Sequence, residues 1–415
     1  MAPMIHGLFG LLSLSALAWL MSENRQRFSW RLLVVGLALQ LGLGFVLLKF
    51  PPFRALFLML NDGVIALQDA IGAGTAFVFG YLGGGAAPFA KGEGGSTFIL
   101  AFQALPLVLL VSALSELLYY WRVLPWIVKG ISKVLQKSMG IGGAVGLGSA
   151  MTIFVGMVEA PLLIRPYLAL MSRAELFAVM TCGMATIAGT MMVLYAAILE
   201  PVIPGAMGHI LTASVISIPA ALMVSLIMVP QLGPETAGEE MPRSTAAGSM
   251  DAIAKGTADG VTLLVNIIAM LIVLVALVSL VNQGLSGLPH WQGEVLTLQR
   301  VLGWFMAPVA WIMGIPWQEA QVAGSLLGTK IVLNEFIAYL DLVKIPKGTL
   351  SDGSRLIMMY ALCGFANIGS LGILIGGLGV MVPERKAEVV SLGFRSIVGG
   401  TLAACMTGTI VGMIV

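Results

Sequence analysis

Residues 182–189 read CGMATIAG and residues 363–370 read CGFANIGS, so Cys, Gly, Ala and Ile recur at a constant offset of 181 (363 − 182). Upstream of these two segments, the tripeptide MGI occurs at 139–141 and again at 313–315. Chance could produce one such match in a chain rich in small residues. Because both landmarks recur in the same order, we interpret the chain as two copies of one structural unit.

The composition excludes a soluble protein. Of the 415 residues, 58% are hydrophobic and 10% are charged, and the mean hydropathy is +0.98. Soluble domains average roughly 45–50% apolar and about 25% charged residues. The net charge of +2 gives no reason to expect nucleic acid as a partner. The chain is therefore predicted to be a polytopic membrane protein whose partner is the lipid bilayer.

Apolar stretches long enough to cross a membrane give the fold class, because a helix needs about 20 such residues. We predict an all-α polytopic membrane protein with eight transmembrane helices, at 5–21, 32–48, 98–120, 176–199, 210–229, 261–281, 356–381 and 389–415. An interfacial helix is expected at 53–82. The interrupted apolar segments 139–171 and 313–343 predict two re-entrant helical hairpins.

The direction of the two copies follows from the number of crossings between them. An odd number of predicted crossings separates the spans 176–199 and 356–381, so these spans run in opposite directions. Inverted repeats with interrupted helices at corresponding places are typical of secondary transporters, and they mark the binding site. The sequence therefore predicts a transporter.

The repeat also divides the chain into segments. Most of the 22 lysines and arginines fall on one side, which orients the polar linker towards the cytoplasm and suits a bacterial inner membrane. The expected segments are the N-terminal scaffold helices with the interfacial helix (1–123), the first repeat (124–232; hairpin 139–171, broken helix 176–199, helix 210–229), the cytoplasmic linker (233–259), a scaffold helix with an external connection (260–300), and the second repeat (301–415; hairpin 313–343, broken helix 356–381, helix 389–415).

Each hairpin carries one membrane-depth glutamate, Glu159 or Glu335. A carboxylate in hydrocarbon costs at least ~2.5–3.5 kcal/mol on insertion scales, so each must be protonated, paired or in contact with water. One alternative is a structural hydrogen bond that holds a hairpin tip. Another is an ion pair between Glu335 and Lys330, five residues earlier. We predict contact with a substrate or a proton for both glutamates.

Other polar side chains lie at the same depth, namely Asn334, Asn367 and Ser370. Asn367 and Ser370 are spaced i, i+3 and so share a helical face. With Glu335 they offer donors and acceptors suited to a polyhydroxylated ligand, and Phe365 offers a flat surface for a ring. The alternative is that Asn367 only joins two helices.

A cage of oxygens for Na⁺ is a further hypothesis. It would combine Thr152 with backbone oxygens near Val155, Thr186 and Ile187. Threonines on apolar helices usually bond to their own backbone instead, and this alternative stays open.

Enzyme signatures are absent from the sequence, which has no HExxH, GxSxG or Walker A loop. We expect no enzyme activity and no cofactor. An intramembrane enzyme that uses Glu159 and Glu335 as an acid–base pair remains the alternative from a different functional class.

Several blocks of this sequence resemble those of a known family, the concentrative nucleoside transporters (solute carrier 28 type, including bacterial nucleoside permeases). The resemblance covers nearly the whole chain and rests on VGMVEAPLL followed by RP within 155–166, ATIAG at 185–189, GIPWQEA at 314–320, VAG at 322–324, NEF at 334–336 and ALCGFANIGSLGILIGGLG at 361–379. It implies ion-driven uptake of nucleosides by homotrimers. It also implies a scaffold and a transport domain that moves as an elevator.

The resemblance also implies roles for individual residues. Glu335, Asn367 and Ser370 would bind the ribose hydroxyls. Phe365 and Met191 would flank the base, and the hairpin tip would read its edge with Gly156, Met157, Val158 and Glu159.

The hairpin tip departs from the family pattern. Its usual sequence is Gly-Gln-Thr-Glu or Gly-Gln-Ser-Glu, whereas this chain has Met157 and Val158 in the middle. Apolar side chains discriminate by only ~1–3 kcal/mol per methylene-sized misfit. We therefore predict base recognition that is broader, or shifted towards another base or a modified nucleoside.

The candidate cation site departs as well. Sodium-coupled members place asparagine where Thr152 stands, so one oxygen ligand is lost. The coupling ion is H⁺ or Na⁺, and the sequence favours protons slightly. The leading prediction is a nucleoside:cation symporter, with a carrier of nucleobases or modified nucleosides as the alternative within transport.

Overall fold

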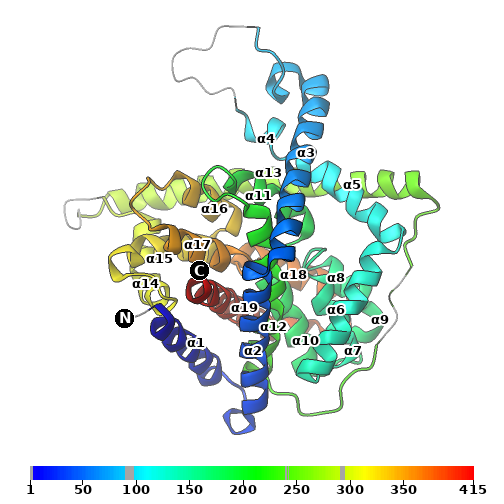
Figure 1. Cartoon of the computed structure of the whole chain (residues 1–415), viewed down its shortest axis with the longest axis vertical. Helices are drawn as coiled ribbons and strands as arrows, with labels where there is room; N and C mark the ends of the chain where they lie inside the picture. The colour runs from blue at the N-terminus through cyan, green and yellow to red at the C-terminus, as the bar shows by residue number, and fades with distance from the viewer. Residues whose placement is uncertain (1–2, 89–97, 239–240, 242, 290–294) are drawn as a thin grey trace.

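All the regular elements are α- or 3₁₀-helices in the part of the chain that the computed structural model describes, residues 3–88, 98–238, 241, 243–289 and 295–415 (Figure 1). Helices satisfy every backbone polar group internally, which a lipid environment requires. The predicted all-α membrane fold is confirmed. Parts of the expected scaffold, linker and external connection (1–2, 89–97, 239–240, 242 and 290–294) lie outside the described residues.

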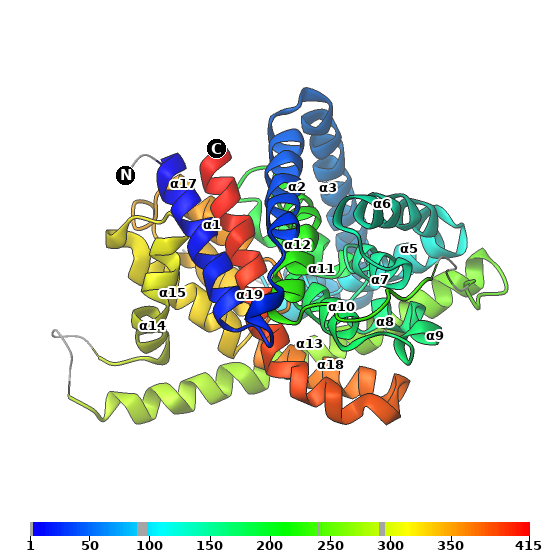
Figure 2. The same ribbon diagram turned by 90° about the horizontal axis from the view of Figure 1, so that it is seen from below.

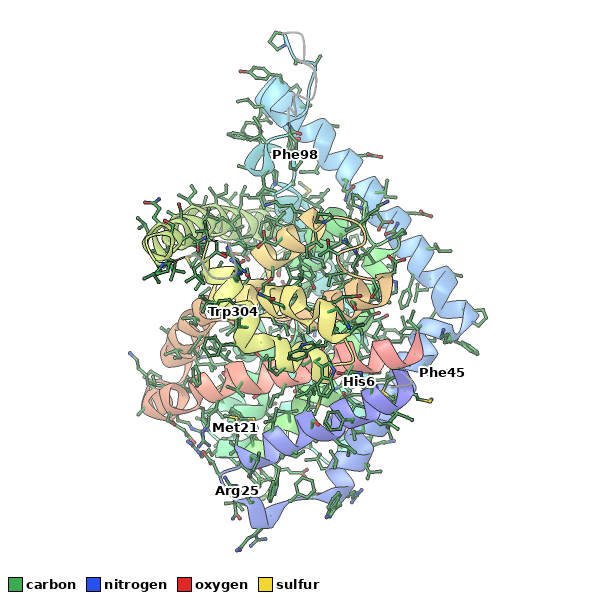
Figure 3. All side chains as sticks on the ribbon, turned by 90° about the vertical axis from the view of Figure 1, so that its left-hand side faces the viewer. His6, Met21, Arg25, Phe45, Phe98 and Trp304 are labelled. Atoms are coloured by element: carbon green, nitrogen blue, oxygen red, sulfur yellow. The ribbon has the colours of Figure 1, made fainter. Side chains whose placement is uncertain are left out.

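The N-terminal segment forms a row of apolar helices: α1 (Pro3–Leu20), η1 (Arg25–Arg27), α2 (Trp30–Lys49), α3 (Pro51–Phe79), η2 (Gly80–Gly83), α4 (Leu100–Gln103) and α5 (Leu107–Tyr120). α1 and α2 lie within about two residues of the expected spans 5–21 and 32–48. The expected span 98–120 is formed by α4 and α5 together. α3 covers the segment expected at the interface. With η2 it reaches 33 residues and is also long and apolar enough to cross a membrane, and Figure 3 shows it extending beyond the other helices near Phe98.

The two halves of the chain repeat one order of helices, as the sequence predicts. The first copy is α6 (Val123–Met139), α7 (Gly143–Met151), α8 (Glu159–Leu163), α9 (Arg165–Leu168), α10 (Arg173–Ala185), α11 (Gly189–Leu199) and α12 (Ala206–Met228). The second copy is α14 (Leu298–Ile312), α15 (Trp317–Val332), α16 (Glu335–Lys344), α17 (Asp352–Leu362), α18 (Ile368–Met381), η3 (Pro383–Arg385) and α19 (Lys386–Ile414). The MGI tripeptide follows the first helix of each copy, and its glycine (Gly140 or Gly314) has positive φ.

The spans expected to be broken are broken. Residues 186–188 separate α10 from α11, and residues 363–367 separate α17 from α18. Each first half begins at a serine N-cap: Ser172, which forms a capping box with Glu175, and Ser351. The Ser172 and Ser351 side chains accept hydrogen bonds from the first turn, which fixes where these helices start.

The linker and the helix after it differ from expectation. α13 (Ser249–Ser286) begins inside the segment 233–259 that was expected to be the polar linker before this helix. Residues 249–259 contain no proline, and the Lys255–Asp251 ion pair (3.0 Å, i, i+4) supports the first turns. The helix therefore continues from the apolar span to Ser249, and its 38 residues extend about 57 Å.

The number of crossing helices also differs in detail from the predicted eight. Among the described residues, seven helices are long and apolar enough to cross a membrane. An eighth is reached if α14 and α15, which are bent by 117° to each other, count as one span. Two predicted spans are not among them: the helix at 5–21 counts as a shorter apolar helix, and the break in 356–381 leaves α18 as another shorter apolar helix.

The core is formed by the last helix of each repeat. α12 and α19 pack against each other, and α10 and α17 pack against α19. α6–α10 lie on one side of this central pair and α14–α17 on the other (Figure 1). Figure 2 shows α1 alongside α19. The two broken spans therefore meet in the most buried part of the molecule.

Candidate functional site

The centre of the site is the Glu335 carboxylate. Glu335 is the first residue of α16, whose N-cap Asn334 accepts a hydrogen bond from the Ile337 amide at 2.9 Å. Its side chain is almost completely buried, with a relative exposure of 4%. The Tyr195 hydroxyl donates to Oε1 at 2.6 Å and the Asn367 amide Nδ2 donates to Oε2 at 2.9 Å. Three elements, α11, α16 and the start of α18, therefore hold this carboxylate.

Asn367 is the N-cap of α18. Its Oδ1 accepts a hydrogen bond from the Ser370 backbone amide at 2.7 Å, while its Nδ2 donates to Glu335. The i, i+3 spacing of Asn367 and Ser370 thus reflects a cap and not two side chains on one helical face. Asn367 joins α18 to α16, which agrees with the alternative that it connects two helices. It also orients the Glu335 carboxylate.

The breaks of the two spans lie against each other. At Gly364, φ is +155° and an added Cβ would lie 2.9 Å from the backbone oxygens of Met184 and Ala185. Only glycine allows this conformation and this close approach. The next residue, Phe365, is partly exposed, and its amide donates to the Thr186 oxygen at 3.2 Å.

The structure brings the two stretches of the candidate Na⁺ site together. The Gly189 amide donates to the Phe154 oxygen at 3.0 Å, which joins the turn after α7, with Thr152 and Val155, to the break that holds Thr186 and Ile187. The Thr152 hydroxyl donates to the Ser149 oxygen at 2.8 Å and the Thr186 hydroxyl to the Cys182 oxygen at 2.9 Å. Both hydroxyls thus bond to their own helices, yet their lone pairs remain available to a cation.

The first hairpin tip differs from the second. Glu159 begins α8 and is exposed, and its carboxylate forms no hydrogen bond or ion pair with any described residue. Its carboxylate folds back over Gly156, and Val158 packs on Gly377 of α18. Gly377 is ten residues after Asn367, or about 15 Å along the helix. The structure does not place the two glutamates in one hydrogen-bonded cluster.

The repeat gives a reason for this asymmetry. At the offset of 181, the counterpart of Tyr195 is Gly376 (195 + 181), and the counterpart of Asn367 is Thr186 (367 − 181). Gly376 has no hydroxyl that could bond to Glu159. The first repeat therefore leaves its carboxylate available, whereas the second repeat holds its carboxylate in place.

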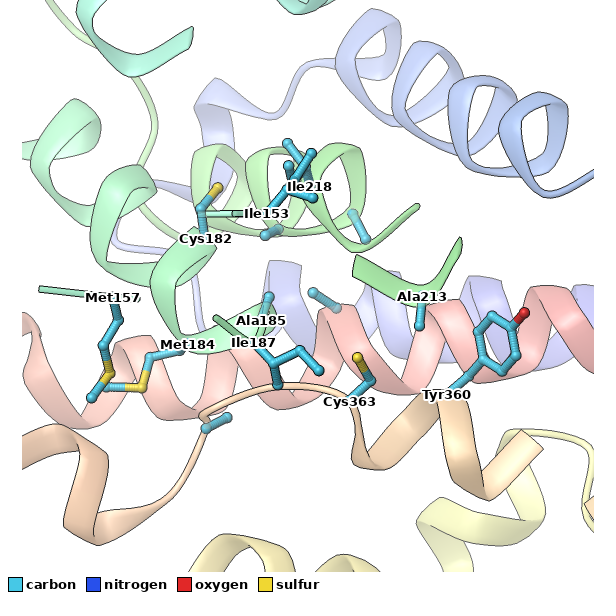
Figure 4. Close-up of a cluster of buried hydrophobic side chains, with 14 of the residues drawn as sticks. Ile153, Met157, Cys182, Met184, Ala185, Ile187, Ala213, Ile218, Tyr360 and Cys363 are labelled. Atoms are coloured by element: carbon cyan, nitrogen blue, oxygen red, sulfur yellow. The ribbon is translucent and has the colours of Figure 1, made fainter. Parts of the chain in front are cut away.

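Two methionines expected near a bound base lie in different surroundings. Met157 is 7% exposed and packs closely on Gly183, and Figure 4 shows it beside Met184, at the opposite end of the cluster from Tyr360. Met191 lies four residues before Tyr195 on α11 and so shares its helical face. Met191 therefore lies on the Tyr195 side of α11, whereas Met157 belongs to the packed interior.

Two residues near the site have contacts that the sequence analysis did not predict. Tyr195 is fully buried, and a tyrosine at membrane depth was a usable signal because its hydroxyl needs a partner. Lys330 is also fully buried, and its Nζ donates to the Ala361 oxygen at 2.9 Å. The structure describes both Lys330 and Glu335, and their side chains form no ion pair. The alternative that Lys330 is the ion-pair partner of Glu335 is therefore wrong.

Comparison with known families covers most of the chain. Residues 209–412 match the family described as "Na+ dependent nucleoside transporter C-terminus" and residues 9–82 match "Na+ dependent nucleoside transporter N-terminus". Residues 101–202, which include the first hairpin, match "Nucleoside recognition".

Individual relatives agree with the family matches. The chain is 34% identical to nucleoside permease NupC of Helicobacter pylori, over 99% of this chain and 98% of that protein. It is 33% identical to human solute carrier family 28 member 3, over 98% of this chain and 59% of that protein. It superposes on CNTnw in an inward-facing substrate-bound state with a TM-score of 0.90 and 35% identity, covering 99% and 98% of the two chains. Since these relatives are transporters, the acid–base enzyme is set aside, and the chain belongs to the Na⁺-dependent, concentrative nucleoside transporter family.

Proposed function

We propose that the chain imports nucleosides by cation symport and that Glu335 binds the ribose. The observation that carries this proposal is the doubly hydrogen-bonded carboxylate. An ionised carboxylate has about four acceptor positions, of which Tyr195 and Asn367 use two. The remaining two match the two hydroxyl donors of a ribose diol. Ser370, whose backbone amide donates to Asn367, completes this polar side of the site.

The base lies on the apolar side in this proposal. Phe365 and Met191 flank its ring, and the tip from Gly156 to Glu159 reads its edge once the movement that opens the site has turned Met157 out of its packed position. Because Met157 and Val158 cannot form hydrogen bonds with their side chains, base recognition is broad or shifted. Replacing them by Gln and Thr should change the order in which nucleosides compete for uptake, and an unchanged order would contradict this part of the proposal.

Transport by alternating access is supported by the burial of Glu335. A solute can reach a carboxylate that is 4% exposed only after the surrounding helices move. Solved structures of CNTnw and its variants include inward-facing, outward-facing and intermediate states. We propose an elevator movement of the two inverted repeats against the N-terminal scaffold, in a homotrimer of the inner membrane.

Sodium is the coupling ion that the observations favour. The matching family is described as Na⁺-dependent, and the oxygens of Thr152 and Thr186 lie where α7 and α10 end. Helix C-termini carry partial negative charge, which attracts a cation. These observations support Na⁺ over the proton that the sequence alone favours.

Reconstituted uptake tests the proposal. Purified protein in liposomes should accumulate labelled uridine under an imposed Na⁺ gradient, and a pH gradient alone should not drive uptake. Glu335→Gln should weaken uridine binding by about 10- to 100-fold, because a hydrogen bond to a charged group contributes about 1.5–3 kcal/mol and about 1.4 kcal/mol corresponds to tenfold. Glu384→Gln, an exposed surface change, is the matched control.

A carrier of nucleobases is the second candidate, and competition separates the two. If Glu335 binds the ribose diol, uridine should compete better than 3′-deoxyuridine, and uracil should compete poorly. Equal competition by uracil and uridine would favour the nucleobase carrier.

A further inference from the structure

Lys330 is a fully buried cation that the proposed binding mechanism does not use. It lies in the last turn of α15, and its relative exposure is 0%. Its Nζ donates to the Ala361 oxygen at 2.9 Å, and Ala361 lies in the last turn of α17. The ammonium group therefore joins the first helix of the second hairpin to the first half of the second broken span.

Negative partial charges from two helix ends surround the ammonium group of Lys330. α15 and α17 pack together, and the C-terminal ends of both helices lie at this ammonium group. Each helix end carries about half a negative charge, and a buried ammonium group without partners would be very costly. Glu335 follows five residues later as the first residue of α16, which packs against α15, so its carboxyl group lies buried in the same region.

The first repeat shows the same arrangement without a lysine. There, α7 and α10 pack together and end at Thr152 and Thr186. α7 reads GAVGLGSAM, and α10 carries no lysine or arginine after Arg173. At the corresponding helix ends, therefore, one repeat contains a lysine ammonium group and the other contains hydroxyl and carbonyl oxygens.

We propose that Lys330 is a positioning residue, a built-in cation that keeps Glu335 ionised and correctly placed for the nucleoside. This inference rests on the proposed role of Glu335 in nucleoside binding. The other titratable groups around the pair come from four elements: Tyr195 on α11, Tyr339 on α16, Cys363 after α17 and Cys405 on α19. Tyrosine and cysteine are neutral near pH 7, so Lys330 is the one positive charge beside Glu335 among these described groups.

The test removes the charge of Lys330 and keeps a side chain of similar length and volume. Lys330→Met is compared with wild type and with Lys344→Met, the same change at an exposed lysine of the same hairpin. Uridine binding to the purified full-length protein in detergent with Na⁺ is measured by calorimetry from about pH 5 to pH 8. We expect Lys330→Met to bind at least about tenfold more weakly at pH 7. On acidification, the pH at which half of the uridine binding is lost should be about one unit higher in Lys330→Met than in wild type. Lys344→Met should match wild type.

The outcomes distinguish this inference from the proposed function. If wild type does not bind uridine, the proposed function fails and this inference fails with it. If wild type binds and Lys330→Met shows an unchanged pH profile, only the Lys330 inference is overturned, because a packing role would not move that profile. If Lys330→Met does not fold, the double variant with Glu335→Gln should restore a monodisperse protein, since no buried carboxylate then lacks its counter-charge. Failure of that rescue would also overturn the inference.

Discussion

Removing the Tyr195 hydroxyl tests whether the buried carboxylate is the ribose site. In Tyr195→Phe the ring remains in its fully buried position, but the 2.6 Å hydrogen bond to Glu335 Oε1 is lost. Asn367 still holds Oε2 at 2.9 Å. The carboxylate can then rotate about a single remaining contact, and a bound nucleoside has to order it.

The magnitude follows from the charge on the acceptor. A hydrogen bond to a charged group contributes about 1.5–3 kcal/mol, and about 1.4 kcal/mol is a factor of ten in affinity. If most of this free energy maintains the geometry that the ribose requires, uridine affinity should fall about 10- to 100-fold. The maximal rate of uptake should change much less, because no element that moves loses a packing contact.

The structure offers a closely matched control in Tyr339→Phe. Tyr339 is also fully buried, its ring centroid is 5.0 Å from that of Tyr195, and its hydroxyl donates to the Met359 oxygen at 2.9 Å. The same atom is removed in both variants, but only Tyr195 bonds to Glu335. Tyr339→Phe should therefore change uridine affinity less than about threefold, since a neutral hydrogen bond contributes about 0.5–1.5 kcal/mol to stability and this one is remote from the ribose.

The assay is concentration-dependent uptake of uridine and of 3′-deoxyuridine into liposomes under a fixed Na⁺ gradient, together with equilibrium binding in detergent. The loss in Tyr195→Phe should be smaller for 3′-deoxyuridine, which makes one fewer hydroxyl contact. Equal losses in the two tyrosine variants would refute the reasoning, and so would an unchanged affinity for uridine in Tyr195→Phe.

Three further outcomes are expected. Thr152→Val should raise the Na⁺ concentration for half-maximal uptake several-fold at saturating uridine, measured by Na⁺ titration; no change would remove Thr152 from the cation site. Gly364→Ala should destabilise the protein by about 1–3 kcal/mol, because φ is +155° and the new Cβ would lie 2.9 Å from two carbonyl oxygens of α10. Thermal melting should show a lower melting temperature for Gly364→Ala. The control variant Gly353→Ala, whose new Cβ would meet open space, should melt like wild type. The hydrogen bond from Arg173 lowers the pKa of Glu23 below its ordinary value, so its stabilisation is present above about pH 4.5 and is lost as the pH falls further. Glu23→Gln should therefore reduce the drop in melting temperature between about pH 5 and pH 3.

The sequence predicted the architecture because its signals are local or periodic. Long apolar runs gave the helical membrane fold, and the CGxAxI and MGI matches gave two copies with the same order of helices. Gly364, within the second break, marked where the second broken span would open. The start of α13 was wrong by about 12 residues, because a polar stretch without proline extends a helix as readily as it forms a loop.

The contacts within the site needed the tertiary structure. Glu335 and Asn367 were selected from the sequence as polar groups, and the structure buries both and bonds them to each other. Tyr195, however, lies 140 residues from Glu335 along the chain, and no local pattern links them. Lys330, only five residues before Glu335, bonds to Ala361 instead of the carboxylate.

The sequence by itself therefore determined that two repeats of apolar helices, each with one acid expected at membrane depth, would form this protein, because hydrophobicity and small-residue motifs are properties of short segments. The tertiary structure alone decided which acid is held and which is left exposed. That difference depends on which residue of the opposite repeat packs against each hairpin tip, a tyrosine hydroxyl at Glu335 and glycines near Glu159.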